Sequence, residues 1–151
     1  MPEVTETSNQ NKALVHAWFR ALGDSDYPAM RELLTEDFEL SVSPSVRGGS
    51  AVGRDDVMAR IVRVFSSGRY YEPGTLACNV LDIIAEGDKT VAHVIMSARF
   101  PNGNSYENIY LVLMYWRAGK MSYQLELFDA AHWAEQHKAT SGPPKNVPSS
   151  A

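Results

Sequence analysis

The sequence predicts an α+β fold in which helices come first and an antiparallel sheet follows. Two observations carry this prediction. Apolar residues recur at helical spacing in the first part of the chain, whereas apolar and polar residues alternate with period 2 after Gly68. The segments GDK, PNGN and AGK, which separate the alternating stretches, are typical of hairpin turns. Helices grouped ahead of an antiparallel sheet indicate α+β rather than a parallel βαβ arrangement.

The expected elements follow in chain order. A first helix carries an apolar stripe from Leu14 to Leu22 and ends near Gly23. Asp26 is expected to cap a short second helix, and a third helix is expected to begin near Arg54. A strand lies between these two helices, and four further strands and a final helix come after them, over residues 38–42, 76–86, 90–100, 106–117, 121–128 and 130–137.

The chain has 151 residues, the length of a single domain. We expect residues 8–137 to form that domain, residues 1–7 to be a mobile N-terminal arm, and residues 138–151 to be a disordered tail, because the tail is rich in Pro and Ser and almost free of apolar residues. The net charge is −4 without a Lys/Arg cluster, so the sequence predicts no nucleic-acid and no membrane-surface partner.

The single cysteine, Cys78, excludes an intrachain disulfide and fits a reducing compartment. No Cys/His set has the spacing of a structural zinc site, so no metal is expected. The N-terminal residues lack the apolar segment of a signal peptide, and no apolar run reaches the ~18 residues of a membrane span. The sequence therefore predicts a cytoplasmic protein.

Alternation sorts the last two strands into faces. One face of the strand over 106–117 carries Tyr106, Asn108, Tyr110, Val112, Met114 and Trp116. In the last strand, the expected faces are Gln124, Glu126 and Phe128 against Met121, Tyr123, Leu125 and Leu127. Both faces of the sheet are rich in large apolar side chains. We therefore expect one face to line the core and a pocket, and the other to be buried in a homodimer.

Three segments carry a family resemblance: ALGDSDYPAMRELLTEDFEL, VGRDDV and SYENIYLVLMYWRAGKMSYQLELFD. In this order and spacing they resemble the nuclear-transport-factor-2-like superfamily, and within it the SnoaL-like polyketide cyclases. The resemblance implies a cone, in which a curved sheet wraps around the first helix and leaves an apolar pocket at the open end. It also implies dimerisation through the outer face of the sheet.

The resemblance implies that Glu126 points inward and acts as an acid or base. Asn108 and Tyr110 are implied to lie on the pocket face, and His93 is placed roughly where limonene-epoxide hydrolases carry a pocket arginine. Other positions depart from known activities of the fold. Ser43 stands near the position of the ketosteroid-isomerase base, Val112 near its oxyanion acid, and Ile95 where the epoxide hydrolases need an aspartate.

The two expected catalytic residues are Glu126 and His93. A carboxyl between Leu125 and Leu127 is expected to have a raised pKa that suits proton transfer near neutral pH. The alternative is a solvated glutamate paired with a basic group. His93 has a side chain that titrates in the useful range, with a structural strand histidine as the alternative.

Five residues are expected to bind the substrate. Asn108 is a polar residue in an apolar strand, so its amide either orients a carbonyl group or satisfies a neighbouring strand. Tyr106 and Tyr110 either donate to a developing enolate or only pack. The remaining two are Gln124, on the face of Glu126, and Trp18, on the apolar stripe of the first helix.

The sequence therefore predicts a cofactor-independent acid/base enzyme that acts on a small apolar carbonyl metabolite, such as a polyketide, terpenoid or steroid-like compound. Isomerisation, cyclisation and dehydration remain open as the reaction. The alternatives are a module of the same fold that binds a small molecule without chemistry, and an accessory domain that only dimerises.

Overall fold

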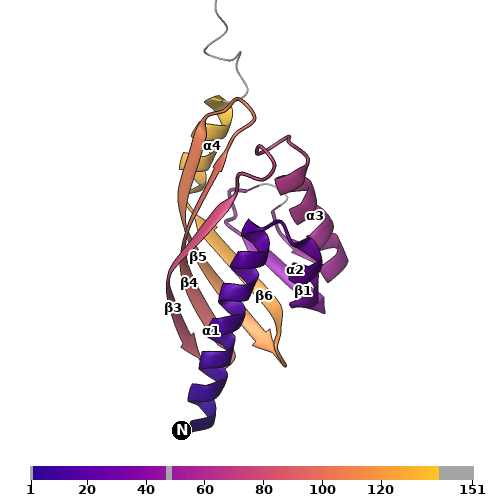
Figure 1. Ribbon diagram of the computed structural model, residues 1–151, viewed down its shortest axis with the longest axis vertical. Coiled ribbons are helices and arrows are strands. Elements are labelled where there is room, and N and C mark those ends of the chain that lie inside the picture. Colours follow the sequence, from indigo (N-terminus) through magenta and orange to yellow (C-terminus); the bar gives the residue numbers. More distant parts are fainter. Residues whose placement is uncertain (1, 47–48, 140–151) are drawn as a thin grey trace, which may run out of the picture.

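The computed structural model describes residues 2–46 and 49–139. The predicted elements occur in the predicted order, and a short strand over Ala51–Val52, where the sequence predicts no strand, is added to them. The six strands form one curved sheet in the order β2-β1-β6-β5-β4-β3 (Figure 1). The helices are α1 (Pro2–Gly23), α2 (Tyr27–Glu32), α3 (Arg54–Ser66) and α4 (Ala130–Ala139). The strands are β1 (Leu34–Val42), β2 (Ala51–Val52), β3 (Ala77–Glu86), β4 (Lys89–Arg99), β5 (Ser105–Arg117) and β6 (Lys120–Phe128). The predicted α+β class is confirmed.

The long helix α1 crosses one face of the sheet and packs on β3 and β4 (Figure 1). Its apolar stripe is buried there, with Val15 and Trp18 at 0% and 2% exposure. Two polar side chains fasten its N-terminal half to the β3–β4 turn, because Gly87 N donates to Ser8 Oγ and Asn11 Nδ2 donates to Gly87 O. These contacts keep α1 across the sheet, where it closes one side of the core.

Residues 2–7 are helical, which corrects the predicted N-terminal arm over residues 1–7. The side chains of residues 3–7 are exposed, and no apolar periodicity marks this segment in the sequence. The segment is compatible with a helix, because Pro2 falls in the first turn, where proline is tolerated. Of the expected disordered tail over 138–151, Lys138 and Ala139 end α4, and residues 140–151 lie outside the described part of the chain.

The predicted cap of α2 is in place, and α3 begins at the predicted residue. The Asp26 side chain accepts from Ala29 N at 3.1 Å and starts α2. Gly53, with φ of 96°, turns the chain from β2 into α3 and donates its N–H to Phe38 O. A side chain would strain this backbone, so glycine directly before Arg54 allows α3 to begin where the sequence predicts.

The last two strands contain a register shift that the sequence does not signal. Tyr115 pairs with Tyr123 and Trp116 pairs with Met121, which leaves Ser122 as an extra residue in β6. The bulge reverses the alternation, so Met121 is fully buried on the same side as Gln124. The prediction that Met121 shares a face with Tyr123 is therefore wrong.

The outer face of the sheet, opposite α1 and α3, is exposed in the described chain. The outer face carries large apolar side chains at high exposure, including Ile84 at 69%, Ile109 at 57% and Leu111 at 50%.

No helix in the described part of the chain combines the length and apolar character that a membrane span requires.

Candidate functional site

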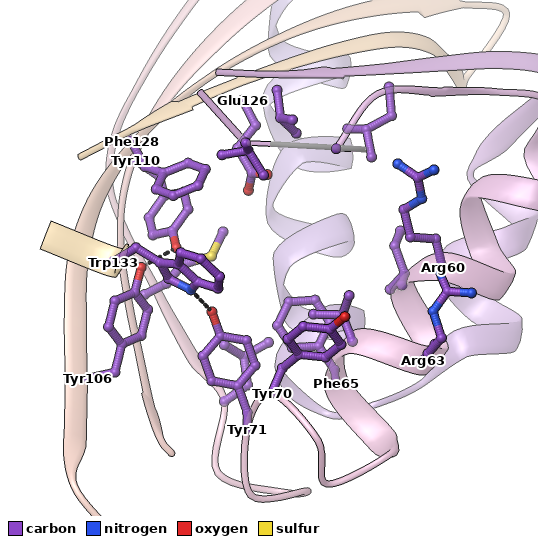
Figure 2. Close-up of a pocket in the computed structure, with 18 residues that line it drawn as sticks. Arg60, Arg63, Phe65, Tyr70, Tyr71, Tyr106, Tyr110, Glu126, Phe128 and Trp133 are labelled. Atoms are coloured by element: carbon purple, nitrogen blue, oxygen red, sulfur yellow. Dashed lines mark hydrogen bonds between the residues drawn. The ribbon is translucent and has the colours of Figure 1, made fainter. Parts of the chain in front are cut away.

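A cavity of about 270 Å³ opens between the sheet, α3 and α4 (Figure 2). Most of its lining is hydrocarbon or aromatic. The aromatic wall consists of rings from α3, the loop that follows it, β5, β6 and α4: Phe65, Tyr70, Tyr71, Tyr106, Tyr110, Phe128 and Trp133. The cavity thus provides the enclosed apolar environment in which a small ligand would be stripped of water.

Glu126 from β6 places its carboxylate in this cavity (Figure 2). The side chain has no ion pair and no hydrogen bond to any part of the chain described by the structure. Burial raises the pKa of the Glu126 carboxyl from 4.5 to about 7, because desolvation penalises the charged form and no positive charge offsets it. Residual exposure of this side chain is toward the cavity, so a ligand entering the cavity would complete its enclosure.

Three of the four phenols in the aromatic wall have a raised pKa. The hydroxyls of Tyr106 and Tyr110 are hydrogen-bonded to each other at 2.6 Å. Desolvation is the largest cause that raises the pKa of Tyr71, of Tyr106 and of Tyr110 above the usual value. All three phenols therefore keep their protons at neutral pH, and one proton of the Tyr106–Tyr110 pair is used in the hydrogen bond between them.

A hydrogen bond from Trp133 makes the Tyr71 hydroxyl oxygen an acceptor and leaves the hydroxyl proton to be donated elsewhere. The indole Nε1 of Trp133 can only donate, and it lies 2.8 Å from the Tyr71 hydroxyl, which therefore accepts. The proton of Tyr71 is left without an acceptor among residues 2–46 and 49–139. Tyr71 can thus donate into the cavity that it lines, toward an oxygen of a ligand.

The loop that carries Tyr71 is fixed to the end of β4. Glu72 N donates to Arg99 O at 2.7 Å, and Arg99 N donates to Thr75 Oγ1 at 3.0 Å. An ion pair of 3.0 Å joins Arg99 Nε to Glu72 Oε2. Tyr71 also stacks between Phe65 and Phe100 at centroid distances of 5.6 and 5.7 Å. These contacts hold the phenol in place without a regular element.

The helix α4 is docked beside the cavity by Asn108 and Asp129. Asn108 Nδ2 donates to Asp129 O at 2.9 Å, and its Oδ1 accepts from Ile109 N at 2.8 Å. The Asp129 carboxylate accepts from His132 N and caps α4. Asn108 is buried on the inner face but does not line the cavity, so its amide supports α4 and not a substrate carbonyl.

His93 lies on the outer face of the sheet, and its predicted place in the pocket is wrong. Its neighbours Ala92 and Val94 are fully buried, and His93 itself pairs across the ladder with Leu111, which is half exposed. Because both faces of β4 carry apolar residues, alternation groups the side chains correctly without identifying the inner face. His93 is on the side away from Glu126 and has no direct part in the site.

The other expected residues are distributed over two adjoining spaces. Tyr106 and Tyr110 line the main cavity. Trp18 and Gln124 line a smaller chamber of about 70 Å³, and Glu126 borders both spaces. The inward direction of Glu126, Tyr106 and Tyr110 therefore agrees with the sequence prediction.

Sequence reasoning missed Tyr71 and Trp133, the pair that presents a free phenol proton. Tyr71 stands in a loop where no periodicity applies, and Trp133 belongs to a short helix whose docking depends on contacts distant in sequence. The available signals were the aromatic doublet at Tyr70 and Tyr71 and a lone tryptophan among small and polar residues. Arg60 and Arg63 of α3, on the side of the cavity opposite Tyr106 and Tyr110, were also not anticipated (Figure 2).

Among the described residues, no group of three or more His, Cys, Asp or Glu side chains is arranged to hold a metal ion. Cys78 packs against the core, and burial raises the pKa of its thiol to about 12.

The comparison with protein families matches the SnoaL-like domain over residues 15–124. No curated protein matches the chain. Solved structures of the same fold include an NTF2-like protein from Burkholderia xenovorans LB400, which is 16% identical with a TM-score of 0.68 and aligns over 86% of this chain and 97% of its own.

Two further solved structures have names that mention an activity or a bound compound. A protein from Jannaschia sp. CCS1, described as a SnoaL-like polyketide cyclase, is 19% identical with a TM-score of 0.72 and aligns over 90% of this chain and 95% of its own. TerC, co-crystallised with polyporic acid, is 16% identical with a TM-score of 0.75 and aligns over 85% and 98% of the two chains. At these identities the likeness establishes the nuclear-transport-factor-2-like fold.

Proposed function

Because the chain belongs to the SnoaL-like domain family, we propose that it is a cofactor-independent acid/base enzyme that acts on a small apolar carbonyl compound. The observation that carries the proposal is the unpaired carboxyl of Glu126, which faces three protonated phenols across an apolar cavity. A carboxyl with a pKa of about 7 is matched to proton transfer at neutral pH, where both of its forms are populated.

The chemical step needs only these groups. The Glu126 carboxylate takes a proton from the carbon next to the carbonyl group, and the electrons of the broken C–H bond move to the carbonyl oxygen to give an enolate. The Tyr71 hydroxyl, whose own oxygen accepts from Trp133, donates a hydrogen bond to that oxygen. The neutral acid of Glu126 then returns the proton to carbon, which completes an isomerisation or precedes a cyclisation or dehydration.

The aromatic wall supports a ligand with flat, conjugated rings. Aromatic side chains bury large apolar areas and stack with a ligand ring at modest cost. TerC, which shares this fold, was crystallised with polyporic acid. We therefore propose polyketide-like or similarly unsaturated carbonyl compounds as the substrate class for this chain.

A non-catalytic binding protein is the second candidate, and one observation favours it. Neither His93 nor Asn108 supplies a polar group to the main cavity, whose lining includes no histidine and no side-chain amide to share the chemistry with Glu126. In that case the carboxyl and the phenols would only hold a ligand by hydrogen bonds.

Deuterium exchange into 2-tetralone, a two-ring ketone with acidic protons beside its carbonyl, separates the two candidates. The enzyme proposal predicts that the protein catalyses this exchange in D₂O, and that Glu126→Gln lowers the rate by ~10²–10⁴. Tyr71→Phe is expected to lower it by ~10²–10³, the usual share of one donor to a developing oxyanion.

Tyr123→Phe is the matched control, because Tyr123 lies on β6 outside the cavity lining. Its rate should equal that of the wild type, as measured by proton NMR. Binding of 2-tetralone without exchange by the wild type, or full exchange by Glu126→Gln, would contradict the enzyme proposal.

The outer face of the sheet supports a further part of the proposal, namely that the protein forms a homodimer. Ladder pairing brings Leu111 beside His93 on one side and beside Leu127 on the other, and Ile109 beside Ile95. Leu111, Leu127 and Ile109 are between 45% and 57% exposed, and they form an apolar surface with no covering element in the described chain. Apolar patches of this kind mark interaction surfaces.

A further inference from the structure

The smaller chamber, of about 70 Å³, adjoins the main cavity beneath Glu126. The two spaces share the five lining residues Leu40, Ile61, Phe65, Met96 and Glu126. Apart from Glu126 and Gln124, the lining side chains of the chamber are hydrocarbon, aromatic or thioether groups. A water molecule occupies about 30 Å³ in the liquid, so the chamber has room for a group of two or three heavy atoms.

Gln124 is the unusual residue of this chamber. The residue is only 7% exposed, and its Oε1 atom is buried without a hydrogen-bond partner in the described part of the chain. Buried amide oxygens in native proteins are nearly always satisfied, because an unpaired acceptor loses its hydrogen bonds with water on folding. The described residues supply no donor to this oxygen, so a hydrogen bond to it would come from a water molecule or a ligand.

The spacing of Gln124 and Glu126 limits how far a donor group of a ligand can be from the ligand atom that contacts Glu126. The two residues are two positions apart on the inner face of β6, which corresponds to about 6.6 Å along a strand. A ligand group that reaches Gln124 is therefore only a few bonds from the atom that lies against the Glu126 carboxylate. The donor belongs on a short arm, since the chamber does not have the volume for a ring.

We propose that the smaller chamber is a subsite for a hydroxyl-bearing arm of the substrate, with Gln124 Oε1 accepting the hydroxyl proton while the apolar body of the substrate lies against the aromatic wall. This inference deepens the proposed function and rests on the main cavity being the ligand site. It narrows the substrate class to carbonyl compounds that carry a hydroxyl group a few bonds from the reacting carbon. Apart from Gln124 and Glu126, the side chains that line the chamber are apolar, so Gln124 is the amide acceptor that this hydroxyl can reach.

A matched pair of ligands tests the subsite by binding alone. The probes are 2-naphthalenemethanol and 2-ethylnaphthalene, which differ only by a hydroxyl in place of a methyl group at the end of a short arm. The wild type should bind the alcohol about two- to twelve-fold more tightly than the hydrocarbon, the usual net value of one hydrogen bond. The affinity is measured by quenching of tryptophan fluorescence, since Trp18 and Trp133 line the two spaces.

Gln124→Met removes the acceptor and keeps a flexible side chain of similar length. The preference for the alcohol should disappear in this variant and persist in Glu126→Gln. Equal affinity of the wild type for both probes, or a preference that survives Gln124→Met, would overturn the subsite. A preference that is lost only in Glu126→Gln would also overturn it, because the hydroxyl would then bind the acid.

A second measurement uses the wild type and does not depend on the folding of any variant. In ¹⁵N-labelled protein, the side-chain amide signals of Gln124 should shift on titration with the alcohol and remain unchanged with the hydrocarbon. Identical responses to the two probes would contradict the proposal. The outcome is independent of turnover: absence of 2-tetralone exchange would remove the proposed reaction and leave this test of the subsite unaffected.

Discussion

The two faces of the sheet are built from similar amino acids and have different properties. On β5, Val112 is fully buried beneath the helices, whereas the adjacent Leu111 is 50% exposed on the other side. The inner face is covered by α1 and α3 and encloses an unpaired carboxyl, while the described chain places no element on the outer face. Apolar composition alone therefore does not distinguish a core from a contact surface; the covering elements do.

The largest expected effect is the loss of folding stability when a charge is introduced on the inner face, compared with the same charge on the outer face. Val112→Asp places a carboxylate in the core and should destabilise the fold by more than about 4 kcal/mol, because no partner is available there. Leu111→Asp should change the stability of the monomer by less than about 0.5 kcal/mol and shift the proposed dimer to monomer. Urea denaturation and light scattering measure the two effects. Equal destabilisation by both substitutions would remove the distinction between the faces.

A smaller effect concerns the pH dependence of stability. Glu126 has a folded-state pKa of about 7 against an ordinary value of 4.5, so between these values the folded chain holds a proton that the unfolded chain has released. Stability should therefore fall as the pH rises through this window. Relative to the wild type, Glu126→Gln should gain up to about 3 kcal/mol at pH 8 and nothing at pH 4.

The control for this comparison is Glu107→Gln, which removes an exposed carboxyl on the outer face of β5. Denaturant titrations of the three proteins at several pH values give the required differences. A gain from Glu126→Gln that is the same at pH 4 and pH 8 would show that the Glu126 carboxyl is not desolvated.

The smallest expected effect is at His93. Because this side chain lies on the outer face, His93→Ala should keep the 2-tetralone exchange rate within about twofold of the wild type at a concentration where both have the same oligomeric state. A loss comparable to that of Glu126→Gln would place the histidine in the chemistry and contradict its position in the sheet.

Local chemistry made much of the fold predictable. Helical and alternating periodicity predicted the order of the main elements, and Asp26 was correctly expected as a helix cap. Alternation placed Glu126 on one face with Gln124 and Phe128, and the family resemblance implied that this face points inward. These features depend on neighbours in sequence, for which spacing and side-chain chemistry are informative.

The failures depend on contacts between distant residues. His93 was placed on the wrong face because Ile95 and Val94 make both sides of β4 apolar, and Met121 because a one-residue bulge reverses the alternation. Tyr71 and Trp133 meet across 62 positions of sequence through a hydrogen bond that no local pattern encodes. The site therefore combines one residue that strand periodicity identifies with two that only the packing of the loop and α4 brings together.

The central claim is that the Glu126 carboxyl lies desolvated and unpaired in an apolar cavity. Its most direct test is a carbon-13 NMR titration of the side-chain carboxyl groups of the wild type and of Glu126→Gln. We predict one glutamate resonance with a midpoint near pH 7 that is absent from the variant. Titration of every glutamate below about pH 5, the range of solvated carboxyls, would contradict the account.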